Sequence, residues 1–174
     1  MIGYRGALSL LEAGHKSVRV GVWYGDRQLG SEDGKEPSFA EKCADTLKAK
    51  GAEIVDFNWA DDASHVKALT GVKTVFCTIP HMENWSDVFP AFLKVAKDKK
   101  VEHFIKVSFL RKGDAAERYR SNVHFVEFHG TCDDLLEQAP NSSRISYTIL
   151  CASHLMSTPL VHQGDYLRKE HKFV

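Results

Sequence analysis

Two short apolar runs with a helical segment between them constrain the fold more than any other feature of this sequence. The runs cover residues 103–110 and 145–151, and both are rich in β-branched and aromatic side chains. Between them, residues 125–139 (FVEFHGTCDDLLEQA) repeat apolar positions at helical spacing. A strand, a crossover helix and a second strand in one sheet form a right-handed βαβ unit. Ligands of such sheets bind outside the carboxyl ends of the strands, so we expect functional residues near 106–111 and 151–156.

The rest of the chain repeats this alternation of helical and strand patterns. Further strands are expected at 18–24, 52–59 and 73–79, and further helices at 6–13, 38–50, 62–71 and 86–99. The run at 73–79 is almost entirely apolar, which is typical of a parallel strand buried on both faces. The pattern predicts an α/β protein with a doubly wound parallel sheet and helices on both faces. At 174 residues, the chain has the length of a single domain.

The composition and the residue patterns argue against several classes of function. Lys plus Arg equals Asp plus Glu, so the formal net charge is zero, which argues against a nucleic-acid binder. No apolar run is long enough to span a membrane and the first residues do not resemble a signal peptide, so a cytoplasmic protein is expected. The four cysteines are scattered without a CxxC pair and the nine histidines are dispersed, so we expect buried reduced thiols and no metal site.

The start of the chain is short for a doubly wound fold that binds a dinucleotide. Such a fold opens with a strand and a glycine-rich turn before its first helix. Here only MIGYRG precedes the first helical pattern, which is too little for a core strand. Gly3 and Gly6 are spaced like part of a glycine-rich turn, although glycines before a helix are more often a plain cap.

Five segments match one family in order and spacing. Residues 2–20 (IGYRGALSLLEAGHKSVRV) are similar to TGATGxxGxxxxxxLLxxGHxVRxLVR, and residues 51–76 (GAEIVDFNWADDASHVKALTGVKTVF) to GVEVVxGDxxDxxSLxxALxGVDxVF. VEHFIKVSFL, FHGTCDDLLEQ and ISYTILCASHLM are similar to VKHFVxxS and HxxxExxLxxxGLxYTILRPxxFM. Together they resemble the NmrA-like proteins, an atypical branch of the short-chain dehydrogenases/reductases. The resemblance implies an NAD(P)-binding Rossmann-like domain over residues 1–174, incomplete at both ends because the family's first strand and C-terminal substrate portion are missing.

The resemblance also implies which residues contact NADP or NAD. Gly3 corresponds to the last glycine of the family's phosphate loop, and Arg27 lies near the position of an arginine that reads the NADP phosphate. Asn58 stands where the family has an aspartate near the adenine. Thr78 and Pro80, at the end of a strand, fall where the family lines the diphosphate and ribose.

Two more cofactor contacts are expected on the strand at 103–110. Ser108 aligns with the serine that ends the corresponding strand in short-chain dehydrogenases, although such a serine often only completes a turn. Lys106 is expected to contact the nicotinamide ribose or phosphate if it faces the ligand. Otherwise it is an edge lysine whose ammonium reaches solvent.

The usual catalytic pair of short-chain dehydrogenases is absent by alignment. Phe125 and His129 occupy the positions of the tyrosine and lysine, and a phenylalanine has no proton to donate. His129 and Asp133 form an i, i+4 pair, for which the simplest explanation is a helix-surface contact worth about 0.3 kcal/mol. The remaining catalytic candidates are Lys106 and His129.

Three hypotheses for function follow. The first is an NAD(P)-binding protein that senses nucleotide or redox state, contacts protein partners and lacks Tyr-Lys chemistry. The second is an NADPH-dependent reductase of the isoflavone- or quinone-reductase type, with a small carbonyl or quinone substrate. The third is a truncated product that binds no cofactor, in which the five strands close into one sheet of order 2-1-3-4-5.

Overall fold

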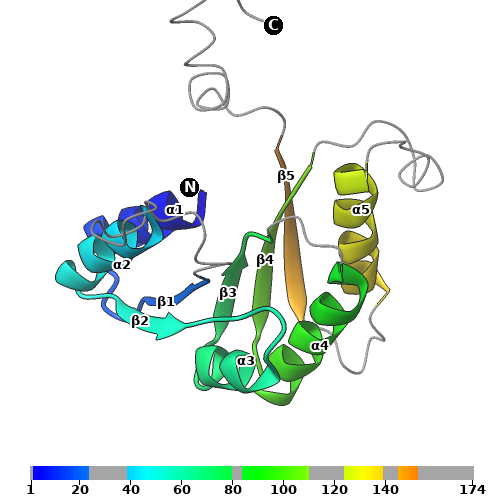
Figure 1. Ribbon diagram of the computed structural model, residues 1–174, viewed down its shortest axis with the longest axis horizontal. Coiled ribbons are helices and arrows are strands. Elements are labelled where there is room, and N and C mark those ends of the chain that lie inside the picture. The colour runs from blue at the N-terminus through cyan, green and yellow to red at the C-terminus, as the bar shows by residue number, and fades with distance from the viewer. Residues whose placement is uncertain (1, 24–38, 80–83, 110–123, 139–144, 153–174) are drawn as a thin grey trace, which may run out of the picture.

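The computed structural model describes residues 2–23, 39–79, 84–109, 124–138 and 145–152. Helices and strands alternate along these residues (Figure 1). The helices are α1 (Ile2–Glu12), α2 (Phe39–Ala49), α3 (Asp62–Leu69), α4 (Trp85–Asp98) and α5 (His124–Glu137). The strands are β1 (Arg19–Val22), β2 (Glu53–Asp56), β3 (Thr74–Cys77), β4 (His103–Phe109) and β5 (Ser146–Ala152). The order of elements confirms the predicted α/β class.

Helix α1 begins at Ile2 rather than at Gly6, so the two early glycines lie inside the helix and not in a loop before it. Close packing on β3 explains why glycines are tolerated there. A Cβ atom at Gly3 would lie 3.3 Å from the Thr78 hydroxyl oxygen, and one at Gly6 would lie 3.5 Å from the Phe76 ring. The helix ends at Glu12, and Gly14 follows it with a φ of 87°, the left-handed conformation typical of a helix stop.

Helix α3, expected to begin at residue 62, is capped by the residue before it. Asp61, rather than Asp62, is the N-cap residue: its backbone is extended, and its carboxylate accepts a hydrogen bond of 2.9 Å from the Ala63 amide. Such a cap typically contributes about 1 kcal/mol. The helix is followed by Gly71, which has a φ of 78° and directs the chain toward β3.

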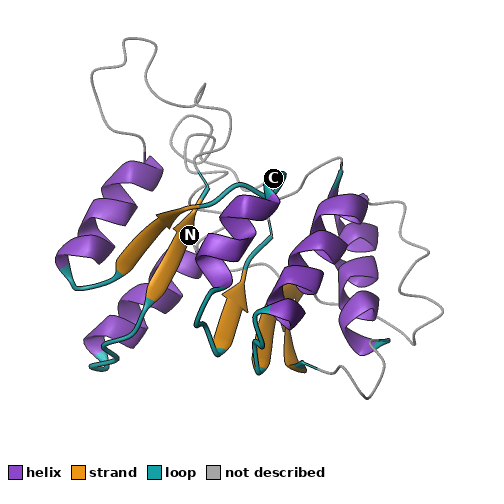
Figure 2. Cartoon of the chain, turned by 90° about the horizontal axis from the view of Figure 1, so that it is seen from below, coloured by secondary structure: helices purple, strands orange, loops and turns teal. Residues whose placement is uncertain are grey.

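Within the described residues, the strands form two parallel sheets instead of one. Strands β1 and β2 pair with each other, while β3, β4 and β5 form a three-stranded sheet with β4 in the middle. The expected closed order 2-1-3-4-5 is therefore wrong, because β1 and β3 are not hydrogen-bonded to each other in the described residues. In the described residues, contacts between helices and strands and the hydrogen bonds of Arg19 join the two sheets, and no strand ladder does. Figures 1 and 2 show the two sheets.

Helices lie on both sides of the sheets, as predicted (Figure 2). Helices α1 and α2 pack on β1 and β2 through a small apolar cluster around Ala7, Leu47 and Ala52. Helices α3, α4 and α5 lie on the other side, over a larger aromatic core. That core includes Phe89, Phe104 and Phe128, each with no exposed surface. None of the described helices is long and apolar enough to cross a bilayer.

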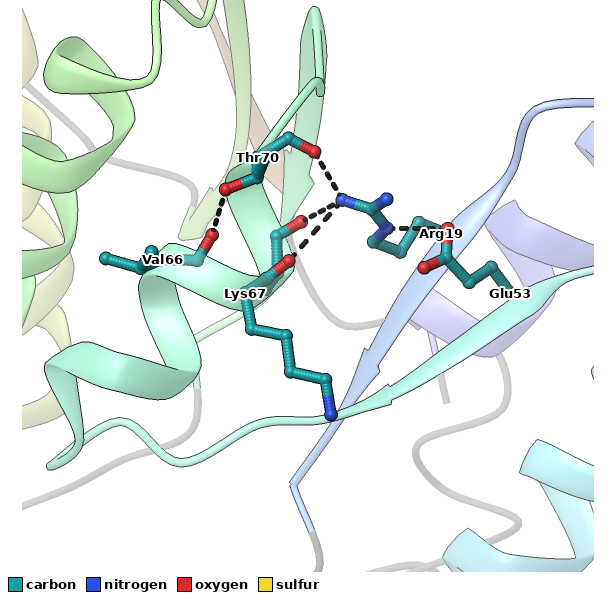
Figure 3. A network of polar contacts seen from close by, with 6 residues as sticks. Arg19, Glu53, Val66, Lys67 and Thr70 are labelled. Carbon is teal, nitrogen blue, oxygen red and sulfur yellow. Dashed lines mark hydrogen bonds and ion pairs between the residues drawn. The ribbon is translucent and has the colours of Figure 1, made fainter.

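Arg19 links the smaller sheet to α3 (Figure 3). Its Nε donates to Glu53 on the neighbouring strand at 2.8 Å. Its Nη1 donates to the carbonyl oxygens at the end of α3, at 3.5 Å to Lys67, 3.2 Å to Ala68 and 2.6 Å to Thr70. These carbonyls carry the negative end of the helix dipole, so a guanidinium suits them. The bonds place the first residue of β1 beside the segment that leads into β3.

Candidate functional site

A buried polar cluster lies between the middle strand β4 and helix α5. The ammonium of Lys106 donates to one carboxylate oxygen of Asp133 at 2.8 Å, and the hydroxyl of Ser108 donates to the other at 2.5 Å. Side chains alternate along a strand, so Lys106 and Ser108 share the face of β4 that also carries the core residue Phe104. Lys106 and Asp133 have no exposed surface, and Ser108 is 3% exposed.

His129 is the member of this cluster nearest to solvent. Its Nδ1 lies 3.2 Å from the Lys106 ammonium, and its backbone carbonyl accepts from the same ammonium at 3.5 Å. The imidazole is only partly buried and packs edge-on against Phe128, with ring centroids 4.8 Å apart. Lys106 thus reaches both the buried carboxylate and a residue at the border of the core.

The structure changes the interpretation of two residues. The expected helix-surface contact is wrong for Asp133, because its carboxylate is fully buried and accepts from β4. The alternative of Lys106 as an edge lysine is also wrong, because β4 is the central strand of its sheet. A buried carboxylate needs a cation and further donors to offset its lost hydration, and Lys106 with Ser108 supplies them.

Two buried thiols flank the cluster. Burial raises the pKa of Cys77 and of Cys132 to about 12, and the positive charge of Lys106 only partly opposes that rise. Both side chains are therefore neutral thiols at physiological pH. The expectation of buried cysteines is confirmed for these two, whereas Cys43 is half-buried and Cys151 on β5 is exposed.

A second group of predicted residues meets at the carboxyl end of β3. The first turn of α1 approaches Thr78 so closely that there is little room for a side chain at the position of Gly3. The turn contains no acidic residue. The first amide groups of a helix have no partner within the helix and carry a partial positive charge. This end of α1, with the exposed Thr78 hydroxyl beside it, is chemically suited to a phosphate group.

Of the remaining predicted cofactor residues, the structure describes only Asn58. Asn58 follows β2 and is exposed. Its side-chain oxygen accepts from the Ala60 amide at 2.9 Å, and its backbone amide donates to the Ser64 hydroxyl at 3.0 Å. Arg27 and Pro80 lie outside the described residues, as does the side chain of Phe125.

The structure therefore brings the predicted residues together in pairs. Gly3 lies against Thr78, and Lys106 is joined to Ser108 through Asp133. Their contacts with a cofactor stay predictions. Sequence reasoning missed Asp133 as the partner of Lys106. A signal was present, because a lysine inside an apolar strand and an aspartate among the apolar positions of α5 both need a buried counter-charge.

The sequence pattern of the NAD(P)H-binding family matches residues 39–173, which is most of the chain. Among curated proteins, none matches this chain.

Solved structures share the fold. The triphenylmethane reductase of Citrobacter sp., crystallised with NADP(H), is 17% identical with a TM-score of 0.63, and the match covers 94% of this chain and 52% of that protein. An NADPH-dependent quinone oxidoreductase from Escherichia coli is 18% identical with a TM-score of 0.64, covering 97% of this chain and 50% of that one. Isoflavone reductase is 18% identical with a TM-score of 0.62, covering 88% and 46%. The chain spans about half the length of these proteins. The likeness confirms the Rossmann-like fold.

Proposed function

This chain belongs to the NAD(P)H-binding family, and on that premise we propose that it is a nucleotide- and redox-sensing regulatory domain without the standard Tyr-Lys dehydrogenase chemistry. This proposal follows the NmrA-like resemblance, which agrees with the comparisons at the level of an NAD(P)-binding fold. The proposed partners are a dinucleotide and a regulated protein, and the proposed location is the cytoplasm.

The observation that carries this proposal is that the polar cluster of Lys106, Ser108 and Asp133 is buried and that its members are hydrogen-bonded to one another. Short-chain dehydrogenases need a lysine that reaches the cofactor and a tyrosine that donates a proton. Here the Lys106 ammonium is buried and bonded to Asp133, and the Ser108 hydroxyl donates to the same carboxylate. With both groups engaged inside the core, they support the packing of α5 on β4 and do not present a proton donor to a substrate.

The end of α1 is the part of the chain best suited to hold the cofactor. We propose that the first amides of α1, with Gly3 and Thr78, bind the diphosphate. A bound nicotinamide would supply the hydride chemistry. The role of this chain's own residues is to bind and orient the phosphates, for which a glycine in the first helical turn keeps the approach to β3 open.

The test is a titration with NADPH and NADH that follows nicotinamide fluorescence and melting temperature together. A ligand that binds only the folded protein raises the melting temperature by mass action. Gly3→Ala should weaken binding because its Cβ would lie 3.3 Å from the Thr78 hydroxyl. Gly6→Ala is the matched control, because its Cβ would make an ordinary contact of 3.5 Å with Phe76. No binding of either nucleotide, or equal effects of the two variants, would contradict the proposed site.

A second candidate function is an NADPH-dependent reductase acting on a quinone or another small carbonyl compound. The half-buried His129 favours it, because its ring nitrogen lies 3.2 Å from the Lys106 ammonium and can exchange a proton with it. The triphenylmethane reductase, quinone oxidoreductase and isoflavone reductase named above share its fold.

Quinone-dependent oxidation of NADPH by the purified protein separates the two candidates. If the protein is a reductase, His129→Gln abolishes turnover while nucleotide binding persists, and the exposed His15→Gln leaves both unchanged. If the protein is a sensor, the wild type and both variants bind the nucleotide, and none of them turns over NADPH with quinones or enones.

A further inference from the structure

The imidazole of His129 faces a charged group with one of its two ring nitrogens. Its Nδ1 lies 3.2 Å from the ammonium nitrogen of Lys106. An imidazole exists in three forms: neutral with the proton on Nδ1, neutral with the proton on Nε2, or cationic with a proton on both. The group that Nδ1 faces therefore decides which form His129 takes.

Lys106 can only donate to this nitrogen. A lysine ammonium has three N–H groups and no lone pair. The charged form of Lys106 follows from its other partner, because the Asp133 carboxylate accepts from it at 2.8 Å and from the Ser108 hydroxyl at 2.5 Å. Lys106 and Asp133 have no exposed surface, so the carboxylate needs the positive charge beside it. The His129 Nδ1 is therefore the acceptor of this hydrogen bond.

The proton of His129 then lies on Nε2. A neutral imidazole has a single ring proton, and a nitrogen that accepts a hydrogen bond does not carry it. The cationic form would direct an N–H group at the Lys106 ammonium, and a like charge at this distance disfavours it. The Asp133 carboxylate opposes this effect only in part, because it already accepts from Lys106 and Ser108.

The other neighbours of His129 bring no further charge to the ring. The next turn of α5 contributes Cys132, whose thiol is neutral because burial raises its pKa to about 12. Helix α4 contributes Trp85, which packs on Phe128 with ring centroids 5.1 Å apart. Phe128 in turn lies edge-on to the His129 ring. Among these described neighbours, Lys106 is therefore the group that sets the protonation of His129.

Lys106 also fixes the position of the ring. Its ammonium donates to the backbone carbonyl of His129 at 3.5 Å as well as to Nδ1, so one side chain holds both the backbone and the imidazole. The imidazole is only partly buried. With Nδ1 held by Lys106, the Nε2–H group is directed away from the ammonium.

We propose that Lys106 is a positioning residue that holds His129 neutral with its proton on Nε2, and that this N–H donates to a carbonyl or hydroxyl oxygen of a ligand bound beside α5. The ammonium behind the ring polarises it and strengthens the Nε2–H as a donor. In this form Nε2 has no lone pair, so His129 does not act as a base toward the ligand. The ligand contact rests on the proposed nucleotide function, whereas the form of His129 does not.

NMR of the full chain with ¹⁵N-labelled histidine tests the form directly, because protonated and unprotonated ring nitrogens resonate far apart. The signals of His129 are identified by their loss in His129→Gln. At pH 7, the wild type is expected to show a neutral ring with the proton on Nε2. A cationic ring, or a neutral ring with the proton on Nδ1, would overturn the proposal.

Two variants test whether Lys106 is the cause. The double variant Lys106→Met/Asp133→Leu removes both charges, so His129 should become half-protonated at about a tenfold lower proton concentration than in the wild type. Ser108→Ala is the matched control, because it removes a donor of the same cluster and keeps the ammonium, and it should leave the form of His129 unchanged. A double variant that matches the wild type, or a control that changes as much as the double variant, would overturn the role of Lys106.

Titration of the labelled wild type with NADPH, followed by nicotinamide fluorescence and NMR together, tests the ligand contact. NADPH carries carbonyl and hydroxyl oxygens, so its binding should shift the Nε2 resonance of His129 and leave the proton on Nε2. Binding without any change at Nε2 would overturn the contact. The expected form of His129 without any binding of NADPH would contradict the proposed nucleotide function and still support the positioning role of Lys106.

Discussion

Replacing Lys106 with methionine tests whether the buried cluster behaves as one electrostatic unit. Methionine keeps the length and apolar contacts of the lysine stem and removes the ammonium. Asp133 would then be a carboxylate with no exposed surface that has lost its donor at 2.8 Å. Breaking a buried pair by removing one partner costs about 3–5 kcal/mol. The Ser108 hydroxyl still donates to the other oxygen, so we expect a loss of about 3 kcal/mol, at the lower end of that range.

The double variant Lys106→Met/Asp133→Leu supplies the comparison. Replacing both members of a buried pair with apolar residues is often neutral or stabilising, so most of the lost stability should return. Urea denaturation with a common m-value measures the free energies of unfolding for the wild type, both single variants and the double variant. A single variant that loses less than about 1 kcal/mol would refute the reasoning, since that is the worth of an exposed pair. A double variant as unstable as Lys106→Met would refute it equally.

Three further predictions concern other parts of the fold. Burial lowers the pKa of His65, so as the pH falls the unfolded chain binds a proton at this histidine before the folded protein does. The free energy of unfolding should therefore decrease below about pH 6.5. In thermal melts, the His65→Phe variant should lack this part of the pH dependence. The exposed Cys151 should react with a thiol reagent in the folded protein, whereas Cys77 and Cys132 should react only after unfolding, which mass spectrometry can resolve. Arg19→Lys should lower the free energy of unfolding by about 1–2 kcal/mol, because a single ammonium cannot bond to Glu53 and to the end of α3 together; an unchanged midpoint in urea would contradict this.

The buried environment of His65 could not be predicted from the sequence. It follows Asp62 by one helical turn, and its Nδ1 lies 3.5 Å from the exposed Asp62 carboxylate. In the structure it has no exposed surface, and its ring is stacked with Phe57 at 5.3 Å and lies edge-on to Phe92 at 5.2 Å. Neither ring nitrogen has a hydrogen-bond partner among the described residues. Phe57 and Phe92 come from different parts of the chain, so no local pattern predicts that their rings meet at His65.

The sequence by itself determined the class of the fold and the places of most elements. Hydrophobic periodicity and the glycines that end helices depend on only a few neighbouring residues. The strand at 103–109 and the end of α1 just before Gly14 can therefore be predicted from the local sequence. The first turn of α1 was misplaced for the same reason, since glycine disfavours a helix locally and only the contact with β3 makes Gly3 and Gly6 suitable there.

Only the tertiary structure decided how the candidate site is built. Lys106 and Asp133 are far apart in sequence, and nothing local tells whether a lysine in an apolar strand faces a ligand, solvent or a buried carboxylate. That choice depends on which helix packs on which face of β4 and on the cost of burying an unpaired charge. The division into two sheets was likewise decided in three dimensions, because strand pairing requires neighbours with the right register, and the alternation of elements along the chain does not specify them.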